Sequence, residues 1–157
     1  MHTFGVMSNN GSEVYYLLEH RHTVDDKGRV SIPADWRAPE GQETTFFLIL
    51  WDKGDQPPCL MGLPPSGMQE LLRRLQSLSL SDSKAESLQR LLARSAKVTA
   101  DKVGRIRLPA QLAKAANLGR DVVLKGMVFR FQIWNPEYYA QVEAKDLEQR
   151  DESHKLI

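Results

Sequence analysis

A ten-residue stretch that occurs twice is the feature that most constrains this chain. The first copy, Asp25 to Ala34, reads D-D-K-G-R-V-S-I-P-A, and the second, Asp101 to Ala110, reads D-K-V-G-R-I-R-L-P-A. The shared Asp, Gly, Arg, Pro and Ala recur at a constant spacing of 76 positions, from 25 to 101 and from 28 to 104. An internal repeat of this kind predicts a molecule built from two related halves.

Each copy predicts the same local structure of strand, turn, strand and helix start. Apolar residues alternate on both sides of the Gly, which is typical of two half-buried strands joined by a tight turn. Gly adopts the backbone angles of such a turn, Asp hydrogen-bonds its backbone, and Pro opens a helix without losing a hydrogen bond. The expected hairpin-forming residues are Asp25, Gly28, Pro33, Asp101, Gly104 and Pro109.

The remainder of each half predicts two more strands. In the first half they are Phe46–Trp51 and Cys59–Leu63, and in the second Asp121–Lys125 and Phe129–Trp134. Alternation in the last strand predicts that Phe129, Phe131 and Ile133 face inward.

Amphipathic segments predict two helices between the repeats and one after them. Ser66 is expected to cap the first, and the second is expected to start at Ser81 or Ser83 and to end near Ala96. Asn135-Pro136 opens the final helix, and the charged tail from Glu143 is expected to be solvated and frayed.

These elements predict an α+β fold, mostly β, in which two repeats form one barrel-like domain with a pseudo-twofold axis. Each half is expected to follow the order β, β, short helix, β, β, helix. We divide the chain into a flexible extension (1–12), repeat 1 (13–65), inter-repeat helices (66–96), repeat 2 (97–140) and a C-terminal helix with its charged tail (141–157).

Composition indicates an ordinary globular protein of 157 residues with a net charge of +1. One cysteine, Cys59, excludes a disulfide framework and fits a reducing compartment. The N-terminus lacks the features of a signal peptide, and the longest apolar run, Phe46–Trp51, is too short to span a bilayer. We therefore expect a cytoplasmic protein with no membrane partner.

No common enzyme signature occurs in the sequence, so we expect no catalytic site, no cofactor and no small-molecule substrate. His20 and His22 lie on one face of a strand, but no third ligand has suitable spacing, and we predict no metal site. Cys59 has no His close by in the sequence and is better explained as a small core residue.

The repeated Arg is the part of the motif that turn formation explains least. Asp and Arg can pair at the surface, but a surface pair does not require Arg. Residues 97–107 carry Lys97, Lys102, Arg105 and Arg107 against Asp101 alone. Arg suits bidentate contact with phosphate or guanine. The residues alone thus leave two alternatives open, a DNA contact surface and a solvated face.

At this point the motifs resemble a known family. H-T-V-D-D-K-G-R-V-S-I-P-A-D-W-R (His22 to Arg37), D-K-V-G-R-I-R-L-P-A-Q-L (Asp101 to Leu112) and I-W-N-P-E (Ile133 to Glu137) are similar to the motifs of MraZ regulators. That family has two swapped-hairpin repeats of the SpoVT/AbrB type. Two positions depart from its pattern: Ala113 stands where the second repeat usually has Arg, and Val103 stands at the position of Lys27.

The resemblance implies a nucleoid-associated transcriptional regulator, usually a repressor. It also implies a ring-shaped homo-oligomer that binds short direct repeats in the double-stranded promoter DNA of the division and cell-wall gene cluster, including its own promoter. The family's DNA-contacting Arg corresponds to Arg29 and Arg105, and its basic neighbours to Lys27 and Lys102. The full set of expected DNA-binding residues is Arg29, Arg105, Lys27, Lys102, Arg107 and Arg21. The alternative is an oligomeric, antitoxin-like interaction module with no specific DNA role. Its distinguishing feature is the pair of inter-repeat helices, which must bury Leu71, Leu75, Leu88 and Leu92 somewhere.

Overall fold

The computed structural model describes residues 14–79 and 81–157. In these ranges the strands are β1 (Glu19–Thr23), β2 (Arg29–Ser31), β3 (Thr45–Trp51), β4 (Cys59–Leu63), β5 (Ala96–Thr99), β6 (Arg105–Arg107), β7 (Asp121–Gly126) and β8 (Phe131–Trp134). The helices are the 3-10 helix η2 (Ala34–Trp36) and the α-helices α1 (Pro65–Ser77), α2 (Ser83–Ala93), α3 (Ala110–Ala115), α4 (Pro136–Glu148) and α5 (Arg150–His154). The predicted order of elements in each half and the α+β class are confirmed.

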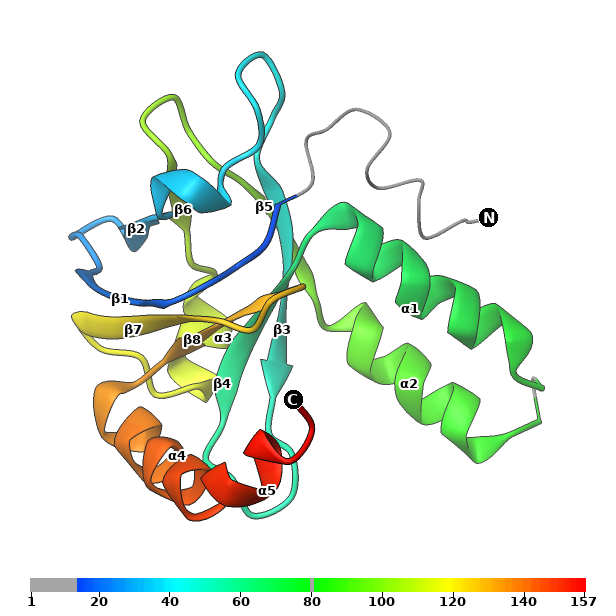
Figure 1. Ribbon diagram of the computed structural model, residues 1–157. Helices are drawn as coiled ribbons and strands as arrows, with labels where there is room; N and C mark the ends of the chain where they lie inside the picture. The colour runs from blue at the N-terminus through cyan, green and yellow to red at the C-terminus, as the bar shows by residue number, and fades with distance from the viewer. Residues whose placement is uncertain (1–13, 80) are drawn as a thin grey trace.

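The two halves exchange strands. β1 of the first half pairs with β7 of the second, and β5 of the second pairs with β3 of the first. A six-stranded sheet results, in the order β1-β7-β8-β4-β3-β5, and this sheet is not closed. β2 and β6 form a separate two-stranded antiparallel ribbon (Figure 1). A tight turn joins β1 to β2, as alternation predicts, but the two strands pair with the other half. Alternation specifies the buried face of a strand and does not specify its neighbour.

One core lies between the sheet and the ribbon, and both halves supply it in equivalent pairs. Residues separated by the repeat spacing both belong to it: Val30 and Ile106, Ile32 and Leu108, Phe46 and Val122, Leu48 and Leu124. Trp36 of η2 occupies the position that Leu112 of α3 has in the other half, and both are buried. The core therefore fixes the ribbon against the sheet from both halves at once.

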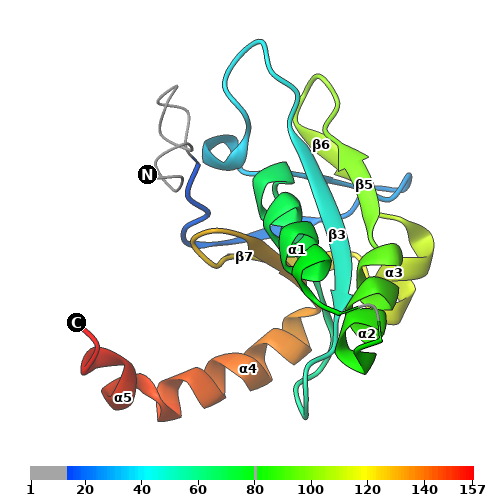
Figure 2. The ribbon, with the colours of Figure 1, turned by 90° about the vertical axis from the view of Figure 1, so that its right-hand side faces the viewer.

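Helices cover the opposite face of the sheet. α1 and α2 pack on β3 and β4 through Met68 and Leu92, which join Ile49, Met61 and Leu63. α4 packs Tyr139 against Cys59, Val123 and Trp134. Figure 2 shows α4 running outward from the sheet toward α5, on a different side from α1 and α2. No helix among the described residues is both long and apolar enough to cross a membrane.

Several local predictions are wrong. Phe129 does not face inward: it lies in the β7–β8 turn with 57% of its surface exposed, whereas Phe131 and Ile133 are buried as predicted. The apolar alternation in the sequence continues through Phe129, but the strand itself begins only at Phe131. The backbone N–H of Met127 donates to Arg130 O, and this hydrogen bond places Phe129 in the turn.

The helix boundaries also differ from prediction. Pro64 stands at the N-cap of α1 in place of Ser66, because Pro65 is pre-organised for the first helical position. Asp82 caps α2 through its side chain, and α2 ends at Ala93 because Ala96 already belongs to β5. The charged tail is exposed but helical rather than frayed, in α4 and α5. The predicted extension at 1–12 lies outside the described residues.

Candidate nucleic-acid interface

In the first turn, Asp25–Arg29, one carboxylate organises both the backbone and the arginine. Asp25 Oδ1 accepts hydrogen bonds from the backbone N–H of Lys27 at 2.9 Å and of Arg29 at 2.8 Å. Asp25 Oδ2 accepts from Arg29 Nε at 2.8 Å. Gly28 sits at a φ of 77°, which favours glycine. We call this set of hydrogen bonds around the Asp25 carboxylate a clamp. The clamp uses Nε of Arg29 and does not require the terminal Nη groups.

The second turn, Asp101–Arg105, repeats the clamp. Asp101 Oδ1 accepts from the backbone N–H of Val103 at 3.0 Å and of Arg105 at 2.9 Å, and Oδ2 accepts from Arg105 Nε at 2.9 Å. Gly104 has a φ of 85°. The repeat in the sequence is thus a repeat in geometry, and Asp and Arg are both needed for it.

The ribbon brings these arginines to one surface. Arg29 lies opposite Arg107, and Ser31 lies opposite Arg105. Cross-strand partners and alternate residues share a face, so all three arginines lie on the outer face of the ribbon, while Val30 and Ile106 are buried on the inner face.

Each turn is also tied to the strand that leaves the other. Leu108 N donates to Gly28 O at 2.8 Å, and Ile32 N donates to Gly104 O at 2.9 Å. These bonds extend the ribbon ladder beyond its strands at both ends. The two turns and the ribbon therefore form one hydrogen-bonded unit.

The clamps hold both carboxylates ionised. Hydrogen bonds from the Arg29 backbone and side chain and from the Lys27 backbone lower the pKa of Asp25 to about 2. The backbone N–H of Arg105, followed by its side chain, lowers the pKa of Asp101 in the same way. The carboxylates of Asp25 and Asp101 therefore stay ionised, and accept from Arg29 and Arg105, at pH values well below neutral.

Comparison with known proteins identifies the family. The family model described as "MraZ protein, putative antitoxin-like" matches residues 91–156. A relative named transcriptional regulator MraZ, from Roseiflexus sp. (strain RS-1), is 38% identical over 128 residues, which cover 81% of this chain and 85% of the relative. Another protein of that name, from Limosilactobacillus fermentum (strain NBRC 3956 / LMG 18251), is 36% identical over 138 residues, covering 85% and 92%. The chain belongs to the MraZ family. The chain is accordingly a transcriptional regulator.

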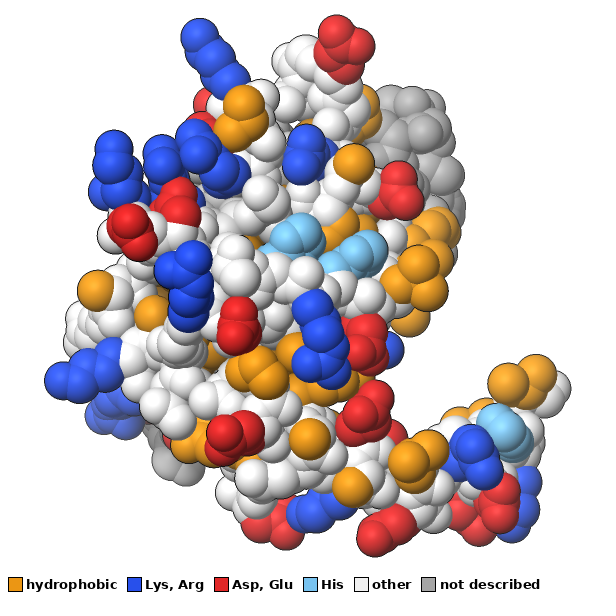
Figure 3. All heavy atoms as spheres, turned by 90° about the vertical axis from the view of Figure 1, so that its left-hand side faces the viewer, with side chains coloured by type: hydrophobic (Ala, Val, Ile, Leu, Met, Phe, Trp, Pro, Cys, Tyr) orange, Lys and Arg blue, Asp and Glu red, His pale blue; other side chains and the backbone are white. Residues whose placement is uncertain are grey.

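The other predicted site residues of this MraZ chain fall into two groups. Lys27 and Lys102 are exposed within the two turns, and Arg107 is exposed on β6. Figure 3 shows Lys and Arg side chains gathered, with some carboxylates, over the upper part of the molecule, where Figure 1 places β2 and β6. Arg21 is not part of this unit: it lies on β1 of the large sheet, and its Nη2 is 3.6 Å from Glu19 Oε2.

One residue next to the site was not singled out from the sequence. Arg37 follows η2, donates from Nε to Ile32 O at 2.9 Å, and lies against Gly104 of the second turn. The sequence did contain a signal for Arg37: its counterpart at the repeat spacing, position 113, is Ala, so the two halves differ there. The contact itself joins residues far apart in the sequence and appears only in the fold.

The remaining candidates have structural explanations. Cys59 is buried in the core, as predicted, and burial raises the pKa of its thiol to about 12. His20 packs edge-on against Trp36 and stacks on His22. Within residues 14–79 and 81–157, no group of three or more His, Cys, Asp or Glu side chains is placed to hold a metal ion.

Proposed function

We propose that this protein regulates transcription by binding specific DNA sequences through Arg29 and Arg105. The observation that carries the proposal is the duplicated clamp, in which an ionised Asp holds Nε of an arginine on one ribbon face. An arginine held in this way loses less side-chain entropy on binding than a free one. Its terminal nitrogens can contact phosphate or guanine as a bidentate pair.

Lys27, Lys102 and Arg107 supply flanking positive charge in this proposal. All three are exposed around the clamped arginines, where they can contact phosphates. Phosphate contacts give affinity that falls with salt, and base contacts give specificity. Arg21 lies outside the ribbon and would add at most a peripheral contact.

The wider role follows from the family resemblance. One chain offers few phosphate contacts, so useful affinity requires several subunits on repeated DNA boxes. We propose a ring-shaped homo-oligomer that binds short direct repeats in the promoter of the division and cell-wall gene cluster. Binding to its own promoter would make the protein a repressor of that cluster, acting at the nucleoid.

The antitoxin-like alternative rested on the apolar faces of the inter-repeat helices. Leu92 is buried, and Leu71, Leu75 and Leu88 pack against the same cluster on β3 and β4. The chain itself covers part of these faces, leaving Leu71, Leu75 and Leu88 half-buried, so it accounts for much of their apolar surface without a protein partner. This observation favours the DNA-binding proposal over the alternative.

The test compares two double variants that remove equal charge. Arg29→Ala with Arg105→Ala should abolish retention of a fluorescent promoter duplex at moderate salt, as measured by anisotropy. Arg73→Ala with Arg90→Ala is the matched control, because both arginines are exposed on α1 and α2 and pair with Glu70 and Glu86. If both double variants bind the duplex like the parent protein, the proposal is wrong.

A further inference from the structure

The two turns have the same clamp but different neighbours. A Cβ atom built on Gly104 would lie 2.2 Å from Arg37 Cζ, 2.4 Å from Nε and 2.7 Å from Nη1. The guanidinium of Arg37 therefore covers the second turn in direct contact, and Gly104 is buried. Among the described residues, a Cβ atom on Gly28 would meet only Leu108 O, at 3.7 Å, and Gly28 is partly exposed.

The Arg37 side chain is itself fixed from two sides. Its Nε donates to Ile32 O at 2.9 Å, and the N–H of Ile32 donates to Gly104 O at 2.9 Å. Arg37, Ile32 and Gly104 thus form a closed set of contacts around the second turn. Loss of the Arg37 guanidinium would leave Ile32 O without this donor and Gly104 without its cover.

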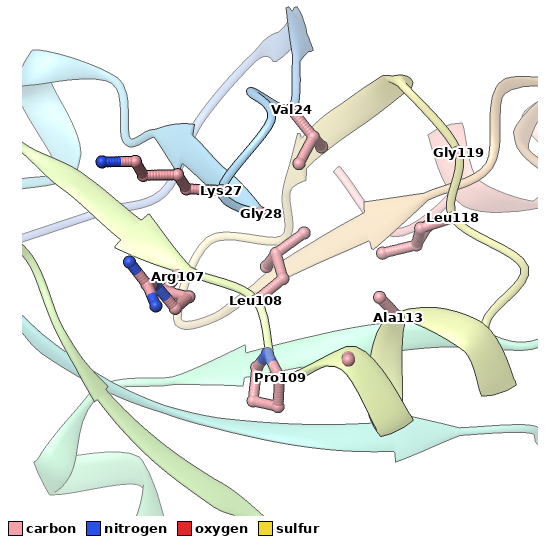
Figure 4. Close-up of a pocket in the computed structure, with 10 residues that line it drawn as sticks. Val24, Lys27, Gly28, Arg107, Leu108, Pro109, Ala113, Leu118 and Gly119 are labelled. Atoms are coloured by element: carbon pink, nitrogen blue, oxygen red, sulfur yellow. The ribbon is translucent and has the colours of Figure 1, made fainter.

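The equivalent space in the other half is a hollow. Ala113 stands at the position of Arg37, and a space of about 450 Å³ opens between it and Gly28. In Figure 4 the side chains of Val24, Leu108, Leu118 and Ala113 converge on this space, whereas those of Lys27 and Arg107 extend away from it. No hydrogen bond from a described residue reaches Leu108 O, the counterpart of Ile32 O.

We infer that Arg37 is a positioning residue for the DNA contact made by Arg105. This inference rests on the proposed function. Arg37 restricts the second turn through Gly104, and Gly104 immediately precedes Arg105. The guanidinium of Arg105 is then held by Asp101 on a turn that is ordered before DNA arrives, which reduces the entropy lost on binding. Within residues 14–79 and 81–157, no side chain covers the first turn, which carries Arg29, in the same way.

The inference predicts coupling between Arg37 and Arg105 but not between Arg37 and Arg29. Arg37→Ala should weaken binding of the promoter duplex by about 3- to 10-fold, the cost of ordering one long side chain and its turn. The same substitution should have little further effect in an Arg105→Ala background and its full effect in an Arg29→Ala background. Thermal melting of each variant establishes that the fold is kept.

A second measurement separates positioning from direct contact. A positioning residue leaves the salt dependence of binding unchanged, whereas a lost phosphate contact lowers the slope of log K against log salt by about 0.9. Arg37→Lys keeps the charge but not the Nε donor, so it should bind like Arg37→Ala.

The outcomes distinguish the two proposals. If Arg37→Ala weakens binding equally in the Arg105→Ala and Arg29→Ala backgrounds, or if Arg37→Lys restores full binding, the positioning role is overturned. DNA binding through the arginines could still hold in that case. If Arg29→Ala and Arg105→Ala themselves leave binding unchanged, the proposed function fails first.

Discussion

The first and second turns carry the same clamp in different surroundings. Distances in the two clamps agree within 0.1 Å, from 2.8 to 2.9 Å for the Arg Nε bonds. Arg37 covers the second turn, while the first turn borders a hollow beside Ala113. Positive charge is redistributed as well: Lys27 and Arg107 flank the hollow, and Val103 and Ser31 stand at their counterparts. The clamp is thus common to both halves, and the support around it has diverged.

The largest expected difference between the turns concerns the glycines. Gly28→Ala should cost about 1–2 kcal/mol of unfolding free energy, because alanine is strained at positive φ. Gly104→Ala carries the same strain and also displaces Arg37 from Ile32 O, which adds about 1 kcal/mol. Urea denaturation of both variants measures the difference. Equal losses would show that Arg37 adjusts without cost and that the cover is not a real distinction.

A smaller difference is expected when the clamps are broken. Asp25→Asn and Asp101→Asn each remove the charged acceptor of an arginine, a partly exposed pair for which the loss in DNA affinity should not exceed about 5-fold. Because Arg37 still orders the second turn, Asp25→Asn should weaken binding more than Asp101→Asn. Fluorescence anisotropy with the promoter duplex measures which variant loses more affinity. Asp55→Asn serves as the control, because it removes the charge of an exposed carboxylate elsewhere on the molecule. The reverse order would contradict the role given to the cover.

The carboxylate titrations should show what the turns have in common. A carboxylate whose pKa is lower in the folded state stabilises the fold above its ordinary pKa, and this contribution is lost as pH falls through the folded value. Asp25 should therefore titrate near pH 2, and Asp101 should also titrate below the ordinary range near 3.9. The titration of each side chain can be followed directly by carbon-13 NMR of the two carboxyl groups. A midpoint near 3.9 for either carboxyl would mean that its clamp does not form in solution.

The smallest effect should come from filling the hollow. Ala113→Arg offers a donor to Leu108 O and a cover for Gly28, and it should slow amide exchange at Gly28 and Arg29 by at most about 5-fold, the equivalent of one net hydrogen bond. Repulsion from Lys27 and Arg107 opposes this gain. Ala113→Leu fills the space without the donor and serves as the control. If the two variants protect the turn equally, packing alone provides the cover.

The sequence predicted the parts of this comparison that depend on local physics. Alternation around Gly28 and Gly104 located the strands and turns, and the Asp-Arg pairing followed from their spacing in the motif. The strand exchange did not follow from alternation, because β1 buries one face whether its neighbour is β2 or β7. The prediction that Phe129 faces inward was wrong for a related reason, since alternation does not show where a strand ends and its turn begins.

The cover over the second turn could not be predicted in the same way. Arg37 and Gly104 are distant in the chain and meet only because the halves exchange strands. The substitution of Ala113 for the equivalent Arg marked the asymmetry in the sequence, but its consequence, a filled space in one half and a hollow in the other, depends on the packed structure.

The salt dependence of the single variants tests the central claim most directly. If the clamped arginines contact DNA phosphates, Arg29→Ala and Arg105→Ala should each lower the slope of log K against log salt by about 0.9, and the double variant by about 1.8. Arg90→Ala, on α2, should leave the slope unchanged. Slopes for both clamp variants equal to that of Arg90→Ala would contradict the account, since the duplicated turns would then not be where this protein meets DNA.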